Sequence, residues 1–170
     1  MLSSYLGVEA GAIAFSTSEH GKPHLDGGST IRFNLSHSRN IALLAVCDGF
    51  DVGVDVEFMR PITDDIAGRF FSSAENAALK ALPEEDRLPS FYACWTRKEA
   101  FLKGLGTGIG GGLDKFSVTL PGQGTPRLSD DGSHITAGWS VAHLEPALGY
   151  VGAVAMKTVP PLVRCFRLEL

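Results

Sequence analysis

The sequence has few of the features that mark secreted, membrane-spanning or nucleic-acid-binding chains. Its 170 residues include only Cys47, Cys94 and Cys165, whose spacing predicts reduced thiols rather than a disulfide framework or a zinc site. No apolar run reaches the roughly 18 to 20 residues of a membrane helix, and no basic segment followed by an apolar one opens the chain. A net charge of −4 argues against nucleic acid as a partner. We therefore expect a cytoplasmic protein.

What remains is the composition of one compact globular unit, 44% hydrophobic and 20% charged. Apolar residues alternate in some stretches and recur every three or four residues in others, which predicts a mixed α+β fold. Helices are expected near residues 64–70, 73–82 and 88–102. Strands are expected near residues 13–15, 32–36, 41–47, 52–57, 116–120, 136–143 and 150–156, with a further strand in the tail, 163–170.

The segment Gly-Val-Asp-Val-Glu, residues 53–57, places two carboxylates where folding alone has no use for them. Successive side chains of a strand point to opposite faces, so Val54 and Val56 share one face. Asp55 and Glu57 then project together from the other face. Two hard oxygen donors therefore converge on one place.

A third carboxylate lies in the middle of a predicted apolar helix stripe. Trp95 and Leu102 belong to that stripe, and Glu99 lies between them at helical spacing. An unpaired buried charge is too costly to persist, so such a group is neutralised, paired or bound to a metal. Lys103 follows Glu99 by four residues and lies at the edge of the same face.

Asp55, Glu57 and Glu99, without a His or Cys cluster, suit a hard cation, and Mg²⁺ is the default. The neighbouring Lys103 indicates a phosphate or pyrophosphate substrate. The alternative is structural: Asp55 and Glu57 line a solvated strand face, and Glu99 pairs with Lys103 or an arginine.

Two earlier motifs complete an ordered set: Gly-Lys-Pro at 21–23 and Asn-Leu-Ser-His-Ser at 34–38 precede the strand motif at 53–57 and Trp-Thr-Arg-Lys-Glu-Ala-Phe-Leu-Lys at 95–103. In this order the chain resembles the 4'-phosphopantetheinyl transferase superfamily, specifically its surfactin-synthetase-type branch, whose single chain contains two similar halves. The resemblance runs from about Tyr5 to at least Leu120.

The resemblance implies a magnesium-dependent enzyme that moves the phosphopantetheine arm of coenzyme A onto a serine of an apo acyl or peptidyl carrier protein, releasing adenosine 3',5'-bisphosphate. Asp55, Glu57 and Glu99 would hold Mg²⁺, and Lys103 would contact the pyrophosphate. Glu99 is the leading candidate for the base. Glu75 is a second candidate, although Ser72 to Glu75 also forms a capping-box sequence.

The nucleotide end of coenzyme A is assigned by the resemblance to three residues. Ser36 and His37 would hold the 3'-phosphate, with His37 expected at a turn after a strand, and Lys22 would lie at the adenine and ribose end. Taken singly, His37 is an exposed histidine and Lys22 a surface lysine. Carrier contact is expected from Arg60, Arg69 and Lys80 with the apolar residues Phe70, Phe71 and Leu79, although apolar residues near a helix are more often part of a core.

The glycine-rich run at 104–112 contains a literal G-x-G-x-x-G. It follows a predicted helix and precedes a predicted strand, which is the reverse of the dinucleotide-binding order. We therefore interpret it as a helix stop and a mobile connector near the site.

For the fold, the resemblance implies antiparallel sheets with packed helices in two pseudo-symmetric halves. Residues 1–50 would be the remainder of the first half and residues 51–170 the second half. Only 21 residues precede Lys22, so the first half is expected to be incomplete. A monomer is implied by the branch, with a dimer as the alternative for so short a chain.

Three functions stay open at this stage. The first is the transferase. The second is a noncatalytic module that binds coenzyme A or a carrier protein. The third is an unrelated magnesium-dependent phosphohydrolase or nuclease that uses the same carboxylates.

Overall fold

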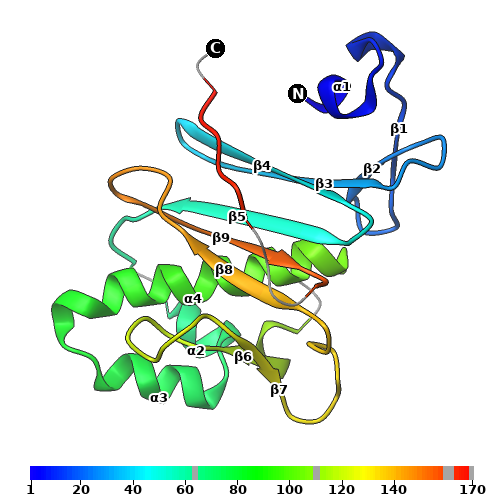
Figure 1. Ribbon diagram of the computed structural model, residues 1–170. Coiled ribbons are helices and arrows are strands. Elements are labelled where there is room, and N and C mark those ends of the chain that lie inside the picture. The colour runs from blue at the N-terminus through cyan, green and yellow to red at the C-terminus, as the bar shows by residue number, and fades with distance from the viewer. Residues whose placement is uncertain (63–64, 109–111, 159–162, 169–170) are drawn as a thin grey trace.

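The fold is layered around one long helix, as the computed structural model shows for residues 1–62, 65–108, 112–158 and 163–168 (Figure 1). The antiparallel sheet β5-β9-β8 lies on helix α4, and the hairpin β3-β4 covers the side of β5 away from that helix. The helices are α1 (Leu2–Leu6), α2 (Ile66–Phe70), α3 (Ser73–Ala81) and α4 (Glu84–Leu105), with 3₁₀ turns at Ala10–Ala12 and Leu113–Lys115. The strands are β1 (Phe15–Thr17), β2 (Pro23–Leu25), β3 (Ile31–Ser38), β4 (Ile41–Asp48), β5 (Val52–Phe58), β6 (Phe116–Val118), β7 (Leu128–Asp130), β8 (Ser140–Leu144) and β9 (Tyr150–Met156).

Helix α4 packs against β5 backbone to backbone. A Cβ at Gly53 would lie 2.0 Å from the carbonyl oxygen of Ala100 and 2.2 Å from the amide nitrogen of Gly104. The absence of a side chain at Gly53 therefore lets the helix approach the strand. Between Ala100 and Gly104 of α4, Phe101 and Leu102 are fully buried in the core.

Strand β3 contacts β5 through side chains. Within the described residues the two strands belong to separate sheets, yet polar side chains of β3 accept hydrogen bonds from β5 amides. Val54 N donates to Asn34 Oδ1 over 2.8 Å, Val56 N to Ser36 Oγ over 3.3 Å, and Phe58 N to Ser38 Oγ over 3.0 Å. The polar side chains at every second position of β3 therefore lie next to the β5 amides that point toward β3, which are also spaced two residues apart.

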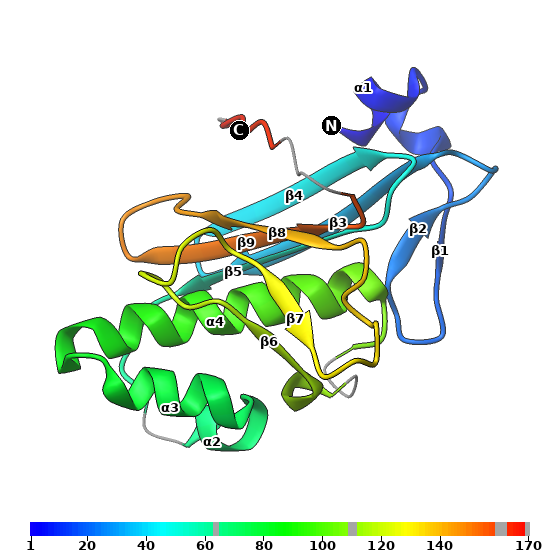
Figure 2. The same cartoon turned by 60° about the horizontal axis from the view of Figure 1, so that its bottom comes forward.

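A buried ion pair between Glu75 and Lys98 joins α3 to α4. Lys98 is 0% exposed, and its ammonium lies 2.9 Å from Glu75 Oε2. Lys98 also donates to the carbonyls of Leu113 and Phe116, and Glu75 accepts from the amide of Val118. Figure 2 shows α3 and the β6-β7 hairpin beneath α4, the segments that this network connects.

The expected α+β class, with antiparallel sheets and packed helices, is confirmed. The strands near 32–36, 41–47, 52–57 and 150–156 and the helices near 73–82 and 88–102 are also confirmed, with α4 longer than expected. The expected tail strand is wrong, because residues 163–168 form no strand and residues 169–170 lie outside the described part. The sequence analysis missed α1, β2 and β7, which are short and have too few residues for a period to show.

The glycine-rich run ends α4 as expected, because Gly106 takes a left-handed conformation with φ 75°. Residues 109–111 of that run lie outside the described residues. All three cysteines are free thiols. In the described residues, no helix is both long and apolar enough to cross a membrane.

Candidate active site

The centre of the candidate site is an ion pair between β5 and α4. Lys103 Nζ lies 2.6 Å from Asp55 Oδ1 and also donates to Ser36 Oγ over 2.9 Å. Asp55 is buried, while about a third of Lys103 (31%) stays exposed. Burial raises the pKa of the Asp55 carboxyl, and the Lys103 ammonium opposes that rise. Lys103 therefore places its positive charge beside the Asp55 carboxylate, and its side chain still reaches solvent.

Glu99 lies one helical turn before Lys103. Its side chain is buried, and its Oε1 atom makes no hydrogen bond to any of the described residues. Burial, with the Asp55 and Glu57 carboxylates as further causes, raises the pKa of Glu99 to about 7. The structural alternative of a Glu99 to Lys103 pair is not what the structure shows, because Lys103 pairs with Asp55.

Glu57 lies at the open end of the same strand face. Its Oε2 atom accepts a hydrogen bond from Ser38 Oγ over 3.0 Å. Partial burial and the neighbouring Asp55 carboxylate raise the pKa of Glu57. Asp55, Glu57 and Glu99 therefore repel one another in the same region, and this repulsion is what a bound cation would relieve.

The donor set fits a hard divalent cation, although the ligands are not gathered into a preformed cage. Among the described residues, no group of three His, Cys, Asp or Glu side chains is close enough to hold a metal. Two buried carboxylate oxygens, Asp55 Oδ2 and Glu99 Oε1, nevertheless lack a hydrogen-bond partner in the part of the chain that the structure describes. Oxygen-only donors with unsatisfied lone pairs suit Mg²⁺, which fills its shell with water and substrate oxygens.

Ser36 and His37 do not lie together. They are successive residues of β3, so their side chains point to opposite faces. The Ser36 hydroxyl is buried and donates to Asp55 Oδ1 over 3.0 Å, whereas His37 is exposed on the other face. The expected turn at His37 is wrong, since β3 continues to Ser38 and pairs His37 with Ala42.

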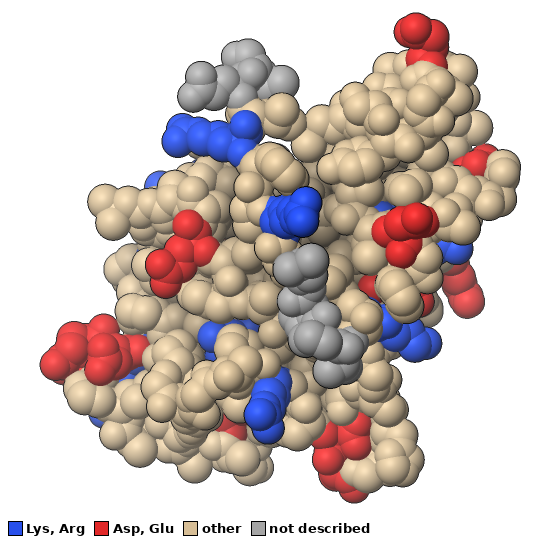
Figure 3. Space-filling model, viewed as in Figure 1, with Lys and Arg blue, Asp and Glu red and all other residues tan. Residues whose placement is uncertain are grey.

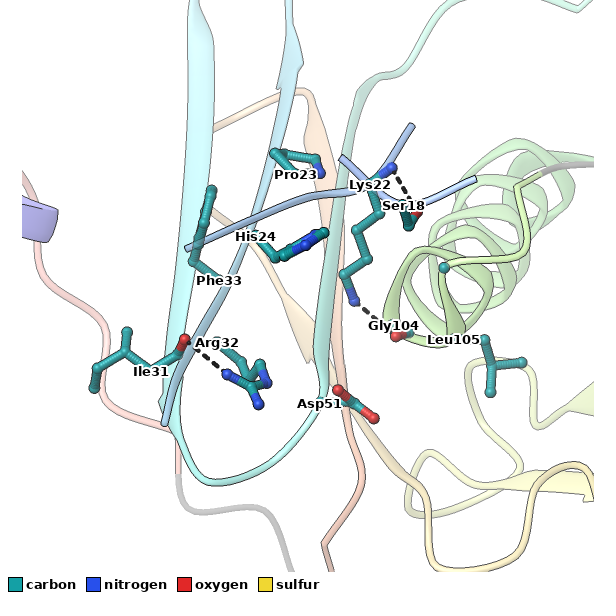
Figure 4. Close-up of a pocket in the computed structure, with 11 residues that line it drawn as sticks. Ser18, Lys22, Pro23, His24, Ile31, Arg32, Phe33, Asp51, Gly104 and Leu105 are labelled. Carbon is teal, nitrogen blue, oxygen red and sulfur yellow. Dashed lines mark hydrogen bonds between the residues drawn. The ribbon is translucent and has the colours of Figure 1, made fainter. Parts of the chain in front are cut away.

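Lys22 is joined to the end of α4. Its ammonium donates to Gly104 O over 2.7 Å and to Val52 O over 3.1 Å, and burial lowers its pKa. Figure 4 shows Lys22 reaching from the β1-β2 hairpin to the C-terminal turn of that helix. Around it lies a cleft of about 190 Å³. Its lining residues come from both hairpins, from the residue before β5 and from the end of α4: Ser18, Lys22, Pro23, His24, Ile31, Arg32, Phe33, Asp51, Gly104, Leu105 and Gly106.

A second cleft, of about 400 Å³, begins at Glu57 and runs along α4. Aromatic side chains of the helix and apolar residues of the segment before α2 form most of its wall. The lining residues are Glu57, Arg60, Pro61, Ile62, Ile66, Phe91, Tyr92 and Trp95. Sequence reasoning did not identify this cleft, because its two walls are about thirty residues apart in the chain.

Glu75 has a structural role. Its Oε2 atom accepts from the amide of Ser72, which closes the capping box, and it also pairs with Lys98. The amide of Val118 donates a hydrogen bond to Glu75 Oε1. With both oxygens used in the core, Glu75 is not free to act as a base.

The surface carries no large field of one sign on the face drawn in Figure 3, where Lys and Arg alternate with Asp and Glu. Of the residues expected at a carrier surface, Phe71 and Leu79 are buried members of the core, so the expectation is wrong for them. Arg60 lines the second cleft.

The fold and the site together define an α+β protein with a carboxylate and lysine cluster suited to phosphoryl chemistry. The family model of the 4'-phosphopantetheinyl transferase superfamily matches residues 51–155, which include β5, α4 and all of β9 except Met156. The chain belongs to this superfamily. The expected branch is also confirmed, because the chain matches the transferases Sfp and HetI.

The chain is 38% identical to 4'-phosphopantetheinyl transferase HetI of Nostoc sp. over 161 residues, covering 92% of this chain and 65% of the relative. It is 34% identical to 4'-phosphopantetheinyl transferase Sfp of Bacillus subtilis, covering 91% of this chain and 67% of the relative. A further Bacillus subtilis 4'-phosphopantetheinyl transferase is 40% identical, with 74% of this chain and 52% of the relative covered. The chain thus spans between about half and two thirds of these relatives' lengths.

Among solved structures, the Thermotoga maritima holo-[acyl-carrier-protein] synthase is similar, with a TM-score of 0.50 and 21% identity over 63% of this chain and 62% of that chain. This likeness supports the fold alone.

Proposed function

We propose that the protein transfers the 4'-phosphopantetheine arm of coenzyme A to a serine of an apo acyl or peptidyl carrier protein. The observation that carries the proposal is the cluster in which Lys103 and three carboxylates from β5 and α4 share one partly open face. The names of the relatives supply the reaction class.

In this reaction the carrier serine oxygen forms a bond to the β-phosphorus of coenzyme A, and the bond from that phosphorus to the bridging oxygen breaks. The products are the phosphopantetheinyl serine and adenosine 3',5'-bisphosphate. Lys103, which stays partly exposed beside Asp55, would bind the pyrophosphate oxygens as a fixed positive charge. Its ammonium would offset the charge that moves to the leaving nucleotide.

Glu99 is the proposed base for the serine proton. Its Oε1 atom is buried and has no hydrogen-bond partner in the described part of the chain. Burial raises the pKa of the metal-free carboxyl to about 7, whereas a bound Mg²⁺ would lower it. Asp55, Glu57 and Glu99 are the proposed Mg²⁺ ligands. When bound, Mg²⁺ would neutralise these carboxylates and polarise the pyrophosphate.

The nucleotide end is proposed at His37 and near Lys22. His37 is exposed, so its imidazole is free to bind a phosphate. Lys22 already uses its ammonium on two carbonyls, so its cleft is proposed to receive the adenosine part while the lysine holds the wall in place. We retain Ser36 as a proposed site residue, although three groups already engage its hydroxyl.

Residues 1–50 and 51–170 are proposed as parts of two related halves, and the protein as a monomer with a dimer as the alternative. Light scattering of the purified chain distinguishes the two states.

Intact-mass spectrometry tests the activity. Apo carrier protein is incubated with this protein, coenzyme A and MgCl₂, and the expected result is a carrier mass increased by one phosphopantetheine arm. The same carrier with its acceptor serine changed to alanine is the control. Binding of coenzyme A or carrier without a mass increase would indicate the noncatalytic module instead. Cleavage of a generic phosphodiester without carrier modification would indicate the phosphohydrolase.

A further inference from the structure

From Asn34 to Ser38, strand β3 places a polar side chain at every second position, and each one accepts a hydrogen bond from an amide of β5. Asn34, Ser36 and Ser38 accept from the amides of the residues that follow positions 53, 55 and 57. Positions 55 and 57 carry the carboxylates, whereas position 53 is a glycine. Each serine therefore lies beside one amide and one carboxylate, and Asn34 lies beside an amide only.

The amide determines where each serine proton points. A hydroxyl has one proton and accepts through its lone pairs, so an amide that donates to the oxygen leaves the proton for another acceptor. That acceptor is Asp55 Oδ1 for Ser36 and Glu57 Oε2 for Ser38, each at 3.0 Å. The sheet edge thus orients two hydroxyls, and the hydroxyls orient two carboxylates.

We propose that Ser38, together with Ser36, is a positioning residue that fixes the carboxylates of Glu57 and Asp55 for a divalent cation. The role rests on the proposed function, because that function assigns the cation to these carboxylates. Outer-shell hydrogen bonds restrict the orientation of ligating carboxylates and strengthen metal binding. Neither serine needs to touch coenzyme A in this role.

The burial of Ser36 is consistent with this assignment. Its hydroxyl donates to Asp55 and accepts from Val56 N and from Lys103 Nζ. These three hydrogen bonds use the full capacity of the hydroxyl. A phosphate could reach it only by displacing one of these partners. Ser38 has no such competition from Lys103, so it is the cleaner residue to test.

Asn34 provides the matched control. It is as buried as Ser36, with 6% of each exposed, and it caps a β5 amide in the same way. Because its neighbour is Gly53, it orients no carboxylate. Asn34→Ala therefore removes an edge hydrogen bond alone, whereas Ser38→Ala removes an edge hydrogen bond and a carboxylate contact.

The test is isothermal titration of Mg²⁺ into the wild type, Ser38→Ala, Ser38→Thr and Asn34→Ala. We expect about a tenfold loss of Mg²⁺ affinity for Ser38→Ala, at the lower end of the range for outer-shell partners. Ser38→Thr keeps the hydroxyl and should restore the wild-type affinity, and Asn34→Ala should match the wild type. If Ser38→Ala does not fold, Ser38→Cys, with its weak donor, must show a smaller loss in the same direction.

Unchanged affinity in Ser38→Ala, an equal loss in Asn34→Ala, or a wild type that binds no Mg²⁺ would overturn the assignment. A transfer assay separates this from the proposed function. In an active enzyme, Ser38→Ala should raise the Mg²⁺ concentration for half-maximal rate and leave the KM for coenzyme A unchanged. If the wild type binds Mg²⁺ more tightly than Ser38→Ala does but transfers nothing, the proposed function is refuted and the positioning role is supported.

Discussion

Glu99→Gln should make the protein more stable at alkaline pH while abolishing transfer. The variant keeps the shape of the side chain and removes its ionisation. The pKa of Glu99 rises from an ordinary 4.5 to about 7 because the carboxyl is buried near Asp55 and Glu57. Each unit of difference corresponds to about 1.4 kcal/mol, so ionised Glu99 costs the folded state about 3 kcal/mol at pH 8.

The sign follows from proton binding. The folded state binds this proton more tightly than the unfolded state, so the contribution of Glu99 to stability is complete below pH 4.5 and is lost as pH rises through about 7. Near pH 4 the wild type and Glu99→Gln should have similar free energies of unfolding. At pH 8 the variant should be more stable by about 3 kcal/mol.

Urea denaturation from pH 4 to pH 8, without divalent cation, measures the difference. Glu85 is exposed in the first turn of the same helix, so Glu85→Gln is the control and should follow the wild type at every pH. Adding MgCl₂ at pH 8 should stabilise the wild type and leave Glu99→Gln nearly unchanged, because a ligand stabilises only the state that binds it. If the free energy of Glu99→Gln changes with pH as in the wild type, Glu99 is not the buried titrating carboxyl that we describe.

Three further outcomes are expected. Gly53→Ala should unfold or strongly destabilise the protein, because the new Cβ meets helix backbone at 2.0 Å; Gly11→Ala, with open space around it, should keep the wild-type melting temperature in calorimetry. Lys98→Met should lower the free energy of unfolding in urea by about 3 to 5 kcal/mol, since it leaves the buried Glu75 carboxylate unpaired, and a loss below about 1 kcal/mol would contradict that pairing. His37→Ala should raise the KM for coenzyme A and leave the KM for 3'-dephospho-coenzyme A unchanged. Equal increases in both KM values would show that His37 does not bind the 3'-phosphate.

The β5 and α4 elements could be predicted from sequence because their signals are local. The valines of β5 alternate with Asp55 and Glu57, and the apolar stripe of α4 encloses Glu99. The same local patterns place all the proposed metal ligands and Lys103 on facing elements.

What could not be predicted depends on partners far away in the chain. The sequence predicts the strand as far as Ser36, but the continuation of β3 through His37 to Ser38 depends on its pairing with β4 and on the amide of Phe58. Lys98 looks like any helix lysine until its partner Glu75 is placed against it. Lys22 likewise needs the end of α4 to show that its ammonium binds carbonyls.

Strand β3 also constrains how this gene can change in length. Asn34, Ser36 and Ser38 each accept a hydrogen bond from a β5 amide, while Leu35 and His37 between them are exposed. Deleting or inserting one codon between positions 34 and 38 would exchange the two sets, turning Leu35 and His37 toward the carboxylates. Substitution of the exposed Leu35 should therefore preserve the fold in a mutational library, whereas a one-residue insertion or deletion between positions 34 and 38 should disrupt it.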